Sequence, residues 1–306
     1  MGEQFIPKVL ELDLDDFLKQ LSKKRRFDKH IELIDKTLIR FPSLKPLLQD
    51  KPKFLMEYDE VWEKLLNVCD YFTTHSNPNI YIRELDIESV DTKFIEKHKK
   101  ILDILLSAIM DRETTRLAQN GFEKRYGLKY DLPTIRFRIL DESLYIAGLS
   151  DISLPLNEFM KLNIVCDRVF ITENKINGLS FPNIKNSMVI FGLGYGVETL
   201  KNVPWLEGKE LLYWGDIDTH GFAILSQIRG YFPHLKSILM GEDMIKKFKF
   251  LAVEESLSKR FLGELNHLTK EEYRVFENLK ENIYGEALRI EQERISFGCL
   301  EALNLP

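Results

Sequence analysis

Apolar residues recur at helical spacing through the first seventy residues of the chain. The segments LDLDDFLKQLSKKRRFDKHIELIDKTLIRF and YDEVWEKLLNVCDYF place them three or four positions apart, which is the period of an amphipathic helix. Between these segments, FPSLKPLLQDKP holds three prolines, which end helices and predict a connection. The turn cluster HSNPN at residues 75–79 marks an expected domain boundary. We therefore predict a helical arm over residues 1–75.

The next stretch mixes helical and strand patterns. DTKFIEKHKKILDILLSAI has the pattern of a long amphipathic helix, with Asp91 or Thr92 as its expected N-cap. After KRYGL, the segments TIRFRIL and SLYIAGL alternate apolar and polar residues on either side of a turn, which predicts a hairpin. Helices followed by a short hairpin are typical of winged-helix domains. We predict a winged-helix-like (α+β) module over residues 76–160.

From residue 161 onward, apolar runs alternate with helical segments. DRVFITEN, SMVIFGLGYG and ELLYWGDID are expected strands, HLKSILM reads as a further strand, and GVETLKNV and HGFAILSQIRGYF are expected helices. This order is typical of βαβ units, whose parallel sheet is buried on both faces. The tail, residues 268–303, is expected to form helices that pack on the sheet. We predict an α/β domain with a parallel sheet over residues 161–306.

The charge of the chain bears on its partners. At 306 residues it is longer than most single domains, and its net charge of −5 does not by itself indicate a nucleic-acid-binding protein. Residues 1–130 carry equal numbers of basic and acidic side chains, so the acidic surplus lies in the remaining residues. DNA binding would therefore depend on local clusters such as KKRRF at 23–27 and EKHKK at 96–100. Such runs are also common on solvated helix faces.

Several classes of protein are disfavoured. Cys69, Cys166 and Cys299 lie far apart without a Cys-x-x-Cys spacing, which argues against a disulfide framework and against a zinc site. No apolar run approaches about 18 residues, and the acidic N-terminal segment does not resemble a secretory or transit peptide. We expect a cytoplasmic protein that makes no contact with a membrane.

Three carboxylates follow two of the expected strands. Glu173 comes after RVFIT, and Asp216 and Asp218 come after ELLYW. Because parallel strands deliver their carboxyl ends to one edge of a sheet, we expect these side chains to converge. Carboxylates in close quarters repel and require protons or cations, and oxygen ligands favour Mg²⁺ or Mn²⁺. A pair of loop and helix-cap aspartates without a metal is the alternative.

Two neighbouring features admit more than one interpretation. His220 could contact a phosphate or act as an acid or base, but a histidine before a glycine at a helix start is more often structural. Gly192, Gly194 and Gly196 follow a strand, with Asp216 about twenty residues later, as in a dinucleotide-binding turn. The third glycine of that fingerprint would fall at Val197. A tight turn is therefore the preferred interpretation, and binding of ATP or NAD is the alternative.

Longer motifs make the chain resemble a known family. TENKING with YWGDIDTHGFAIL resembles the Toprim domain, a metal-binding α/β module whose signature is a glutamate after one strand and Asp-x-Asp after a later one. Together with KRYGL, TIRFRILD, GLSDISLPLNEF, FGLGYGVETL and LRIEQERI, these motifs are similar to JetD, the nuclease subunits of bacterial Wadjet plasmid-defence systems. The resemblance runs from about residue 80 to the C-terminus.

This resemblance implies a site, a reaction and partners. Glu173, Asp216 and Asp218 match the metal-binding acids, so a Mg²⁺- or Mn²⁺-dependent endonuclease that cleaves double-stranded plasmid DNA is expected. The family further implies a homodimer that receives DNA from an SMC-kleisin-type ATPase complex, JetABC. A cytoplasmic protein that becomes nucleoid-associated when it acts on DNA would follow.

The resemblance also leaves alternatives. The family is distantly similar to the A subunit of topoisomerase VI, in which a tyrosine of a winged-helix domain attacks DNA. Tyr126 in KRYGL is the candidate for such a transesterase, and a packed aromatic is its plainer interpretation. A non-catalytic DNA-binding subunit is the other alternative. In LRIEQERI, Arg289 and Glu293 have the spacing of a helical ion pair, and Glu291 or Glu293 could instead support the acid site.

Overall fold

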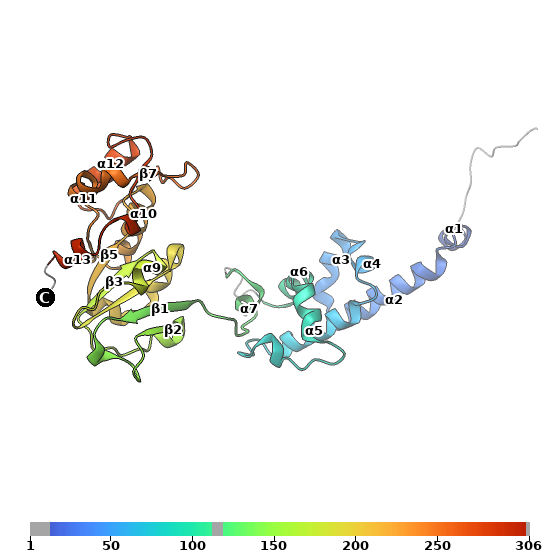
Figure 1. The fold of residues 1–306 in the computed structure, drawn as a ribbon. Coiled ribbons are helices and arrows are strands. Elements are labelled where there is room, and N and C mark those ends of the chain that lie inside the picture. Colours follow the sequence, from blue (N-terminus) through green and yellow to red (C-terminus); the bar gives the residue numbers. More distant parts are fainter. Residues whose placement is uncertain (1–12, 112–118, 304–306) are drawn as a thin grey trace, which may run out of the picture. The chain divides into compact units, whose positions relative to one another are not determined.

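The computed structural model describes residues 13–111 and 119–303 (Figure 1). The chain divides into two compact units, residues 1–131 and residues 132–306. The acidic N-terminal segment lies mostly outside the described residues. This is the segment that does not resemble a secretory or transit peptide. Each unit has a hydrophobic core of its own.

The first unit is helical, as the apolar spacing predicted. Its core is centred on α5, where Trp62, Leu65 and Phe72 are fully buried. The proline-rich stretch is not a plain connection: Pro42 and Pro46 stand in the first turns of two short helices, where a missing backbone N–H costs nothing. The helices are α1 (Leu14–Gln20), α2 (Lys24–Arg40), η1 (Pro42–Leu44), α3 (Lys45–Asp50), α4 (Phe54–Glu57) and α5 (Trp62–Thr74).

A long helix completes this unit. Helix α6 (Thr92–Ile109) begins where the sequence predicts it, because the side chain of Asp91 accepts a hydrogen bond of 2.9 Å from the backbone N–H of Phe94. Its apolar face packs against α5. The short elements η2 (Ile82–Glu84) and α7 (Phe122–Arg125) precede and follow it.

The second unit is built on a six-stranded sheet in the order β2–β1–β4–β3–β5–β6. Strands β4, β3, β5 and β6 are parallel, and the β1–β2 hairpin joins the sheet antiparallel to β4. All residues of β3 and β4 are buried, which confirms the predicted α/β class. The strands are β1 (Thr134–Ile139), β2 (Asp151–Pro155), β3 (Arg168–Thr172), β4 (Ser187–Phe191), β5 (Glu210–Trp214) and β6 (Lys236–Ser237).

The expected hairpin lies in this sheet and not with the helices that precede it. The inward residues of β1, Ile135, Phe137 and Ile139, are fully buried in the core of the second unit. The boundary between the units therefore falls at residues 131 and 132, and not near residue 160. SLYIAGL is not the second strand, because it forms the 3₁₀ turn η3 (Glu142–Leu144) and a short reversal before β2.

Helices and two short strands complete the second unit. The tail contains the predicted helix α12, but the stretch around Arg289 is extended. Strand β8 pairs with β7, and Ile290 exchanges backbone hydrogen bonds of 2.9 and 3.1 Å with Ile217. Those bonds replace a helical ladder. The elements are α8 (Leu156–Phe159), α9 (Lys175–Leu179), η4 (Gly194–Asn202), η5 (Pro204–Gly208), α10 (Thr219–Tyr231), α11 (Glu242–Phe248), η6 (Lys249–Leu251), β7 (Val253–Glu254), α12 (Lys270–Lys280), β8 (Leu288–Arg289), η7 (Gln292–Arg294) and α13 (Gly298–Glu301).

Two further expectations concern cysteines and membranes. Cys69, Cys166 and Cys299 are buried free thiols, in agreement with the sequence. Among the described residues, we find no helix with the length and apolar character needed to cross a bilayer.

Candidate functional site

The candidate site forms at the carboxyl ends of β3 and β5, which are neighbours in the sheet. Thr172 at the end of β3 pairs in register with Trp214 at the end of β5. From β3 the chain continues to β4 on one side, and from β5 it continues to β6 on the other. Open α/β sheets bind ligands at such a reversal of strand order. The three predicted acids, Glu173, Asp216 and Asp218, lie here near enough for their charges to act on one another.

Glu173 follows β3 and is held by a neighbouring strand. The hydroxyl of Tyr213, a fully buried residue of β5, donates a short hydrogen bond to Oε1 of Glu173. A side chain at Gly215 would clash with both of these groups, so the absence of a Cβ there makes room for the carboxylate. Burial, together with the negative charge of Asp216, raises the pKa of Glu173 to about 7 although the Tyr213 hydroxyl opposes the shift.

Asp218 caps the helix that follows β5. It is 4% exposed, and its Oδ1 accepts a hydrogen bond of 2.7 Å from the backbone N–H of Gly221 in the first turn of α10. Any side chain at Gly221 would collide with the carbonyl of Asp216, so this turn requires glycine. Burial, together with the charge of Glu255, raises the pKa of Asp218 to about 7. The helix-cap interpretation of this aspartate is therefore correct, and it leaves Oδ2 available for other contacts.

Asp216 is contacted from the C-terminal tail. Its Oδ1 accepts a hydrogen bond of 2.7 Å from the backbone N–H of Gln292, and its Oδ2 accepts from Nε and Nη2 of Arg289 at 3.2 and 2.7 Å. Nε of Arg289 also lies 3.2 Å from Oδ2 of Asp218. The side chain of Gln292 is fixed in turn, because Thr172 at the end of β3 donates to its Oε1 at 2.6 Å.

These contacts correct the interpretation of LRIEQERI as a helix. Arg289 does not pair with Glu293, since it belongs to β8 and its guanidinium reaches Asp216 and Asp218. Glu293 accepts a hydrogen bond from Nδ2 of Asn174. Glu291 is 3.7 Å from Nη2 of Arg289, so it contacts the arginine that pairs with the two aspartates.

Sequence reasoning also missed a fourth carboxylate near these acids. Glu255, 4% exposed, directly follows β7 and accepts hydrogen bonds from the backbone N–H groups of Thr219 and His220 at 3.3 and 3.2 Å. The hydroxyl of Thr219 donates to it at 2.8 Å. Glu255 therefore stabilises the N-terminus of α10, the same end that Asp218 caps. No local pattern announces it, because β7 has only two residues.

The carboxylate side chains of this site have the ligand chemistry that a hard divalent cation prefers. All candidate ligands are carboxylate oxygens, which Mg²⁺ and Mn²⁺ prefer, and two of the carboxyl groups carry pKa values raised by burial and mutual repulsion. As the side chains stand, no three acidic, histidine or cysteine groups within the described ranges are close enough to share an ion. Oδ2 of Asp216 and Oδ2 of Asp218 face Arg289 instead.

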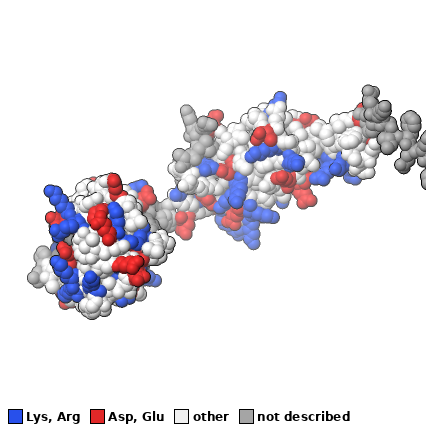
Figure 2. All heavy atoms as spheres, turned by 90° about the horizontal axis from the view of Figure 1, so that it is seen from above, with Lys and Arg blue, Asp and Glu red and all other residues white. Residues whose placement is uncertain are grey.

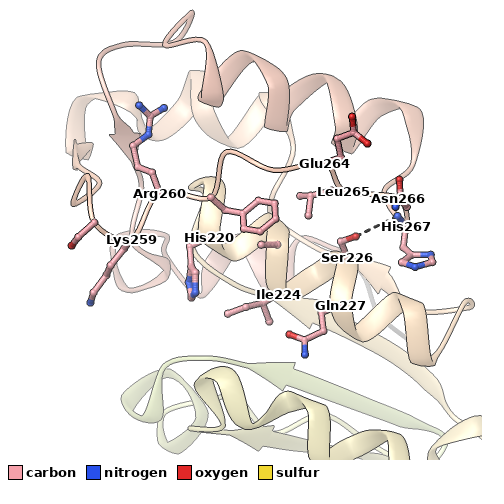
Figure 3. Close-up of a pocket in the computed structure, with 13 residues that line it drawn as sticks. His220, Ile224, Ser226, Gln227, Lys259, Arg260, Glu264, Leu265, Asn266 and His267 are labelled. Carbon is pink, nitrogen blue, oxygen red and sulfur yellow. Dashed lines mark hydrogen bonds between the residues drawn. The ribbon is translucent and has the colours of Figure 1, made fainter.

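His220, two residues after Asp218, lines a pocket of about 510 Å³ (Figure 3). Figure 3 shows His220, Ile224 and Gln227 of α10 along one side and the segment from Lys259 to His267 along the other. Burial, together with the positive charge of Lys259, lowers the pKa of His220 although Glu255 opposes the shift. A neutral imidazole is therefore expected at pH 7.

Tyr126 is packed inside the first unit. It is 2% exposed, and its hydroxyl donates to Oδ1 of Asp103 at 2.8 Å and lies 3.3 Å from the hydroxyl of Ser107. Burial raises the pKa of the phenol. A tyrosine nucleophile must be deprotonated and must reach a phosphate, and this environment opposes both. The structure favours the interpretation of Tyr126 as a packed aromatic.

The glycine motif forms a turn. Gly192 takes a positive φ of 75°, and the chain continues into η4, a 3₁₀ helix. A dinucleotide-binding turn presents the N-terminus of an α-helix to the pyrophosphate. Since no α-helix begins there, the tight-turn interpretation is favoured.

Two family models match the chain. A family model described as Wadjet protein JetD, C-terminal, matches residues 127–303, which is more than half of the chain. A second model, described as an uncharacterized protein conserved in bacteria, N-terminal (DUF3322), matches residues 1–107. No curated protein matches the chain. The boundary between the two matches lies close to the boundary between the two structural units.

Proposed function

The chain belongs to the family of the Wadjet protein JetD, and from that premise we propose that it is the DNA endonuclease of a Wadjet defence system. The observation that carries this proposal is the position of Glu173, Asp216 and Asp218 after two neighbouring parallel strands at the switch point of the sheet, where their charges act on one another. We assign this sheet to a Toprim domain. A parallel sheet with one acid after β3 and an Asp-x-Asp after β5 supports that assignment.

The three acids are proposed to bind Mg²⁺ or Mn²⁺. Bound there, the cation supplies Lewis-acid activation of the scissile phosphate and neutralises charge on its oxygens. Tyr213 orients Glu173, and the backbone N–H groups of Gly221 and Gln292 orient Asp218 and Asp216. In hydrolysis, water adds to phosphorus while the bond to the 3′ oxygen breaks. We propose that His220 contacts the phosphate or the leaving oxygen. We further propose that the pocket beside His220 holds the adjoining DNA strand.

The exposed face of α6 is the proposed DNA-contact surface of the first unit. Lys93, Lys97 and Lys100 are exposed at helical spacing, and no ion pair involves them in the part of the chain that the structure describes. In KKRRF, by contrast, Lys24 is neutralised by Asp15 and Asp28 at 2.6 and 2.9 Å. Figure 2 shows basic and acidic side chains interspersed on the visible face of both units. Phosphate contacts at such a surface give affinity without sequence specificity.

Membership of a Wadjet family supports a proposal about the partners of this protein. We propose that the protein acts as a homodimer, with one site for each DNA strand, and that the JetABC SMC-kleisin-type complex delivers plasmid DNA to it. A net charge of −5 is consistent with a subunit that relies on others to capture DNA.

Plasmid cleavage tests the proposal. Purified protein with Mg²⁺ or Mn²⁺, with and without JetABC, is expected to cut closed-circular plasmid, and Asp216→Asn is expected to abolish the cut. The matched control is Asp167→Asn, an exposed aspartate at the opposite end of β3. Equal cleavage by the Asp216→Asn protein would move the chemistry elsewhere. Metal binding without cleavage under every condition would favour a non-catalytic DNA-binding subunit.

A further inference from the structure

We infer that Arg289 is a built-in counter-cation of the Asp216–Asp218 pair, which an incoming divalent cation must displace. The inference rests on the proposed metal site and makes Arg289 a positioning residue for it. The guanidinium lies 2.7 Å from Oδ2 of Asp216 through Nη2 and 3.2 Å from Oδ2 of Asp218 through Nε. No other cation among the described residues forms an ion pair with either aspartate.

Burial explains why such a cation is needed. The side chains of Asp216 and Asp218 are 19% and 6% exposed, and Glu173 and Glu255 add negative charge nearby. Carboxylates in close quarters and away from water are unstable unless a positive charge or a proton neutralises them. Arg289, with 30% of its side chain exposed, supplies that charge while keeping a route to solvent.

The two aspartates divide their oxygens in the same way. One oxygen of each is anchored by a backbone N–H, that of Gln292 for Asp216 and that of Gly221 for Asp218, both at 2.7 Å. The other oxygen of each faces Arg289. The oxygens that face the arginine are those that a metal ion would require, so the guanidinium and the ion compete. The anchored oxygens keep both carboxylates in place when the guanidinium leaves.

A second carboxylate, that of Glu291, lies near the guanidinium of Arg289. Nη2 of Arg289 is 3.7 Å from Oε1 of Glu291. Strand β8 is held by its pairing with β7 and by the backbone hydrogen bonds between Ile290 and Ile217. In the proposed exchange, the guanidinium therefore moves from the aspartates toward Glu291 while the backbone of β8 stays in place.

Direct measurement of Mn²⁺ binding tests this exchange. Free Mn²⁺ would be quantified by electron paramagnetic resonance in titrations of the full chain, wild type and Arg289→Gln. Removal of the competing cation is expected to tighten Mn²⁺ binding by about tenfold or more, because the ion no longer has to break the hydrogen bonds between the guanidinium and the carboxylates. Arg274→Gln is the matched control, because Arg274 pairs with Glu242 and with neither the aspartates nor Glu291. Its Mn²⁺ affinity is expected to equal that of wild type.

Thermal unfolding provides a second readout that does not depend on activity. Without metal, Arg289→Gln is expected to melt below wild type, and saturating Mn²⁺ is expected to raise its melting temperature more than that of wild type. Arg289→Lys keeps the charge but not the fork geometry, so it should bind Mn²⁺ with intermediate affinity. This variant serves if Arg289→Gln does not fold.

The outcomes separate this inference from the proposed function. Unchanged or weaker Mn²⁺ binding by Arg289→Gln, with wild-type binding that Asp216→Asn abolishes, would overturn the role of Arg289 and leave the metal site standing. If neither wild type nor Arg289→Gln binds Mn²⁺ in a way that Asp216→Asn abolishes, the metal site itself is wrong and the exchange falls with it.

Discussion

Among the acids of the site, Glu173 accepts a side-chain hydrogen bond from a neutral donor, Tyr213. Its hydroxyl donates to Glu173, which is enclosed at the end of β3. Tyr213→Phe is expected to lower the free energy of unfolding by about 1–3 kcal/mol, because a hydrogen bond from a fully buried hydroxyl to a carboxylate is lost. Denaturant unfolding of the metal-free protein would measure it. Tyr231→Phe is the control and should change less, because the Tyr231 hydroxyl accepts a hydrogen bond of 3.2 Å from the neutral side-chain amide of Gln227 and not from or to a charged group.

A single substitution at Tyr126 distinguishes DNA hydrolysis from transesterification. Tyr126→Phe is expected to keep plasmid cleavage and free DNA ends, because the hydroxyl serves a buried contact to Asp103. A loss of stability of about 1–3 kcal/mol should accompany the change. The checks are gel analysis of the cut plasmid and denaturant unfolding. A folded Tyr126→Phe protein without activity, or protein covalently attached to the DNA made by wild type, would support the transesterase.

Among the elements, α10 connects the site to the tail. Asp218 and Glu255 stabilise its first turn, and Arg229 in its last turn binds Glu272 of α12 through Nη2 at 2.7 Å. Arg229 and Glu272 are both nearly buried. This ion pair therefore joins the C-terminal end of α10, the helix that Asp218 caps, to α12 of the tail.

The Arg229–Glu272 pair predicts a pH dependence of stability. Burial opposes ionisation, but the hydrogen bonds from Arg229 and Ser237 outweigh it and lower the pKa of Glu272 below 4.5. A lowered folded-state pKa stabilises above the unfolded value and is lost as pH falls through the folded value. The stability difference between wild type and Glu272→Gln should therefore be constant near pH 7 and shrink below about pH 4.5. Glu277→Gln on the same helix, where the carboxylate pairs with Lys280, is the control.

The exposed face of α6 predicts a salt dependence of DNA binding. Replacing Lys93, Lys97 and Lys100 by Gln should weaken binding to all sequences alike and reduce the slope of log K against log salt by about one for each lysine that pairs with a phosphate. Fluorescence anisotropy at several salt concentrations would measure the slope. As control, Lys19, Lys36 and Lys161 are exposed lysines already paired with acids. Equal slopes for the two triple variants would remove α6 from the interface.

For the whole molecule, the two cores predict independent folding. The second unit contains the complete sheet, the acids and the Arg289 segment. The fragment 132–306 is expected to unfold cooperatively by itself and to bind Mn²⁺ as tightly as the full chain, because every group in the site lies within it. Circular dichroism and Mn²⁺ titration would test both statements. A fragment that folds but does not bind Mn²⁺ would show that the first unit completes the site.

Much of the fold was readable from short-range patterns. The apolar runs of β3, β4 and β5, the helical spacing of α2, α5 and α6, and the cap at Asp91 depend on neighbours within a few residues. The hairpin shows the limit of such patterns. Alternation in TIRFRIL indicates a strand with one buried face, but it does not say which core buries that face, and β1 joins the sheet of the second unit.

The sequence by itself determined that Glu173, Asp216 and Asp218 follow buried strands, because a strand run and the residue after it are local. Only the tertiary structure decided what surrounds them. Arg289 and Gln292 lie 73 and 76 residues from Asp216, and Glu255 lies 36 residues from Thr219. Two-residue strands and a single backbone bridge bring these groups to the site. Elements that short leave no periodic signal in the sequence. The spacing of Arg289 and Glu293 therefore resembles that of a helical ion pair, although long-range hydrogen bonds hold Arg289 in an extended segment.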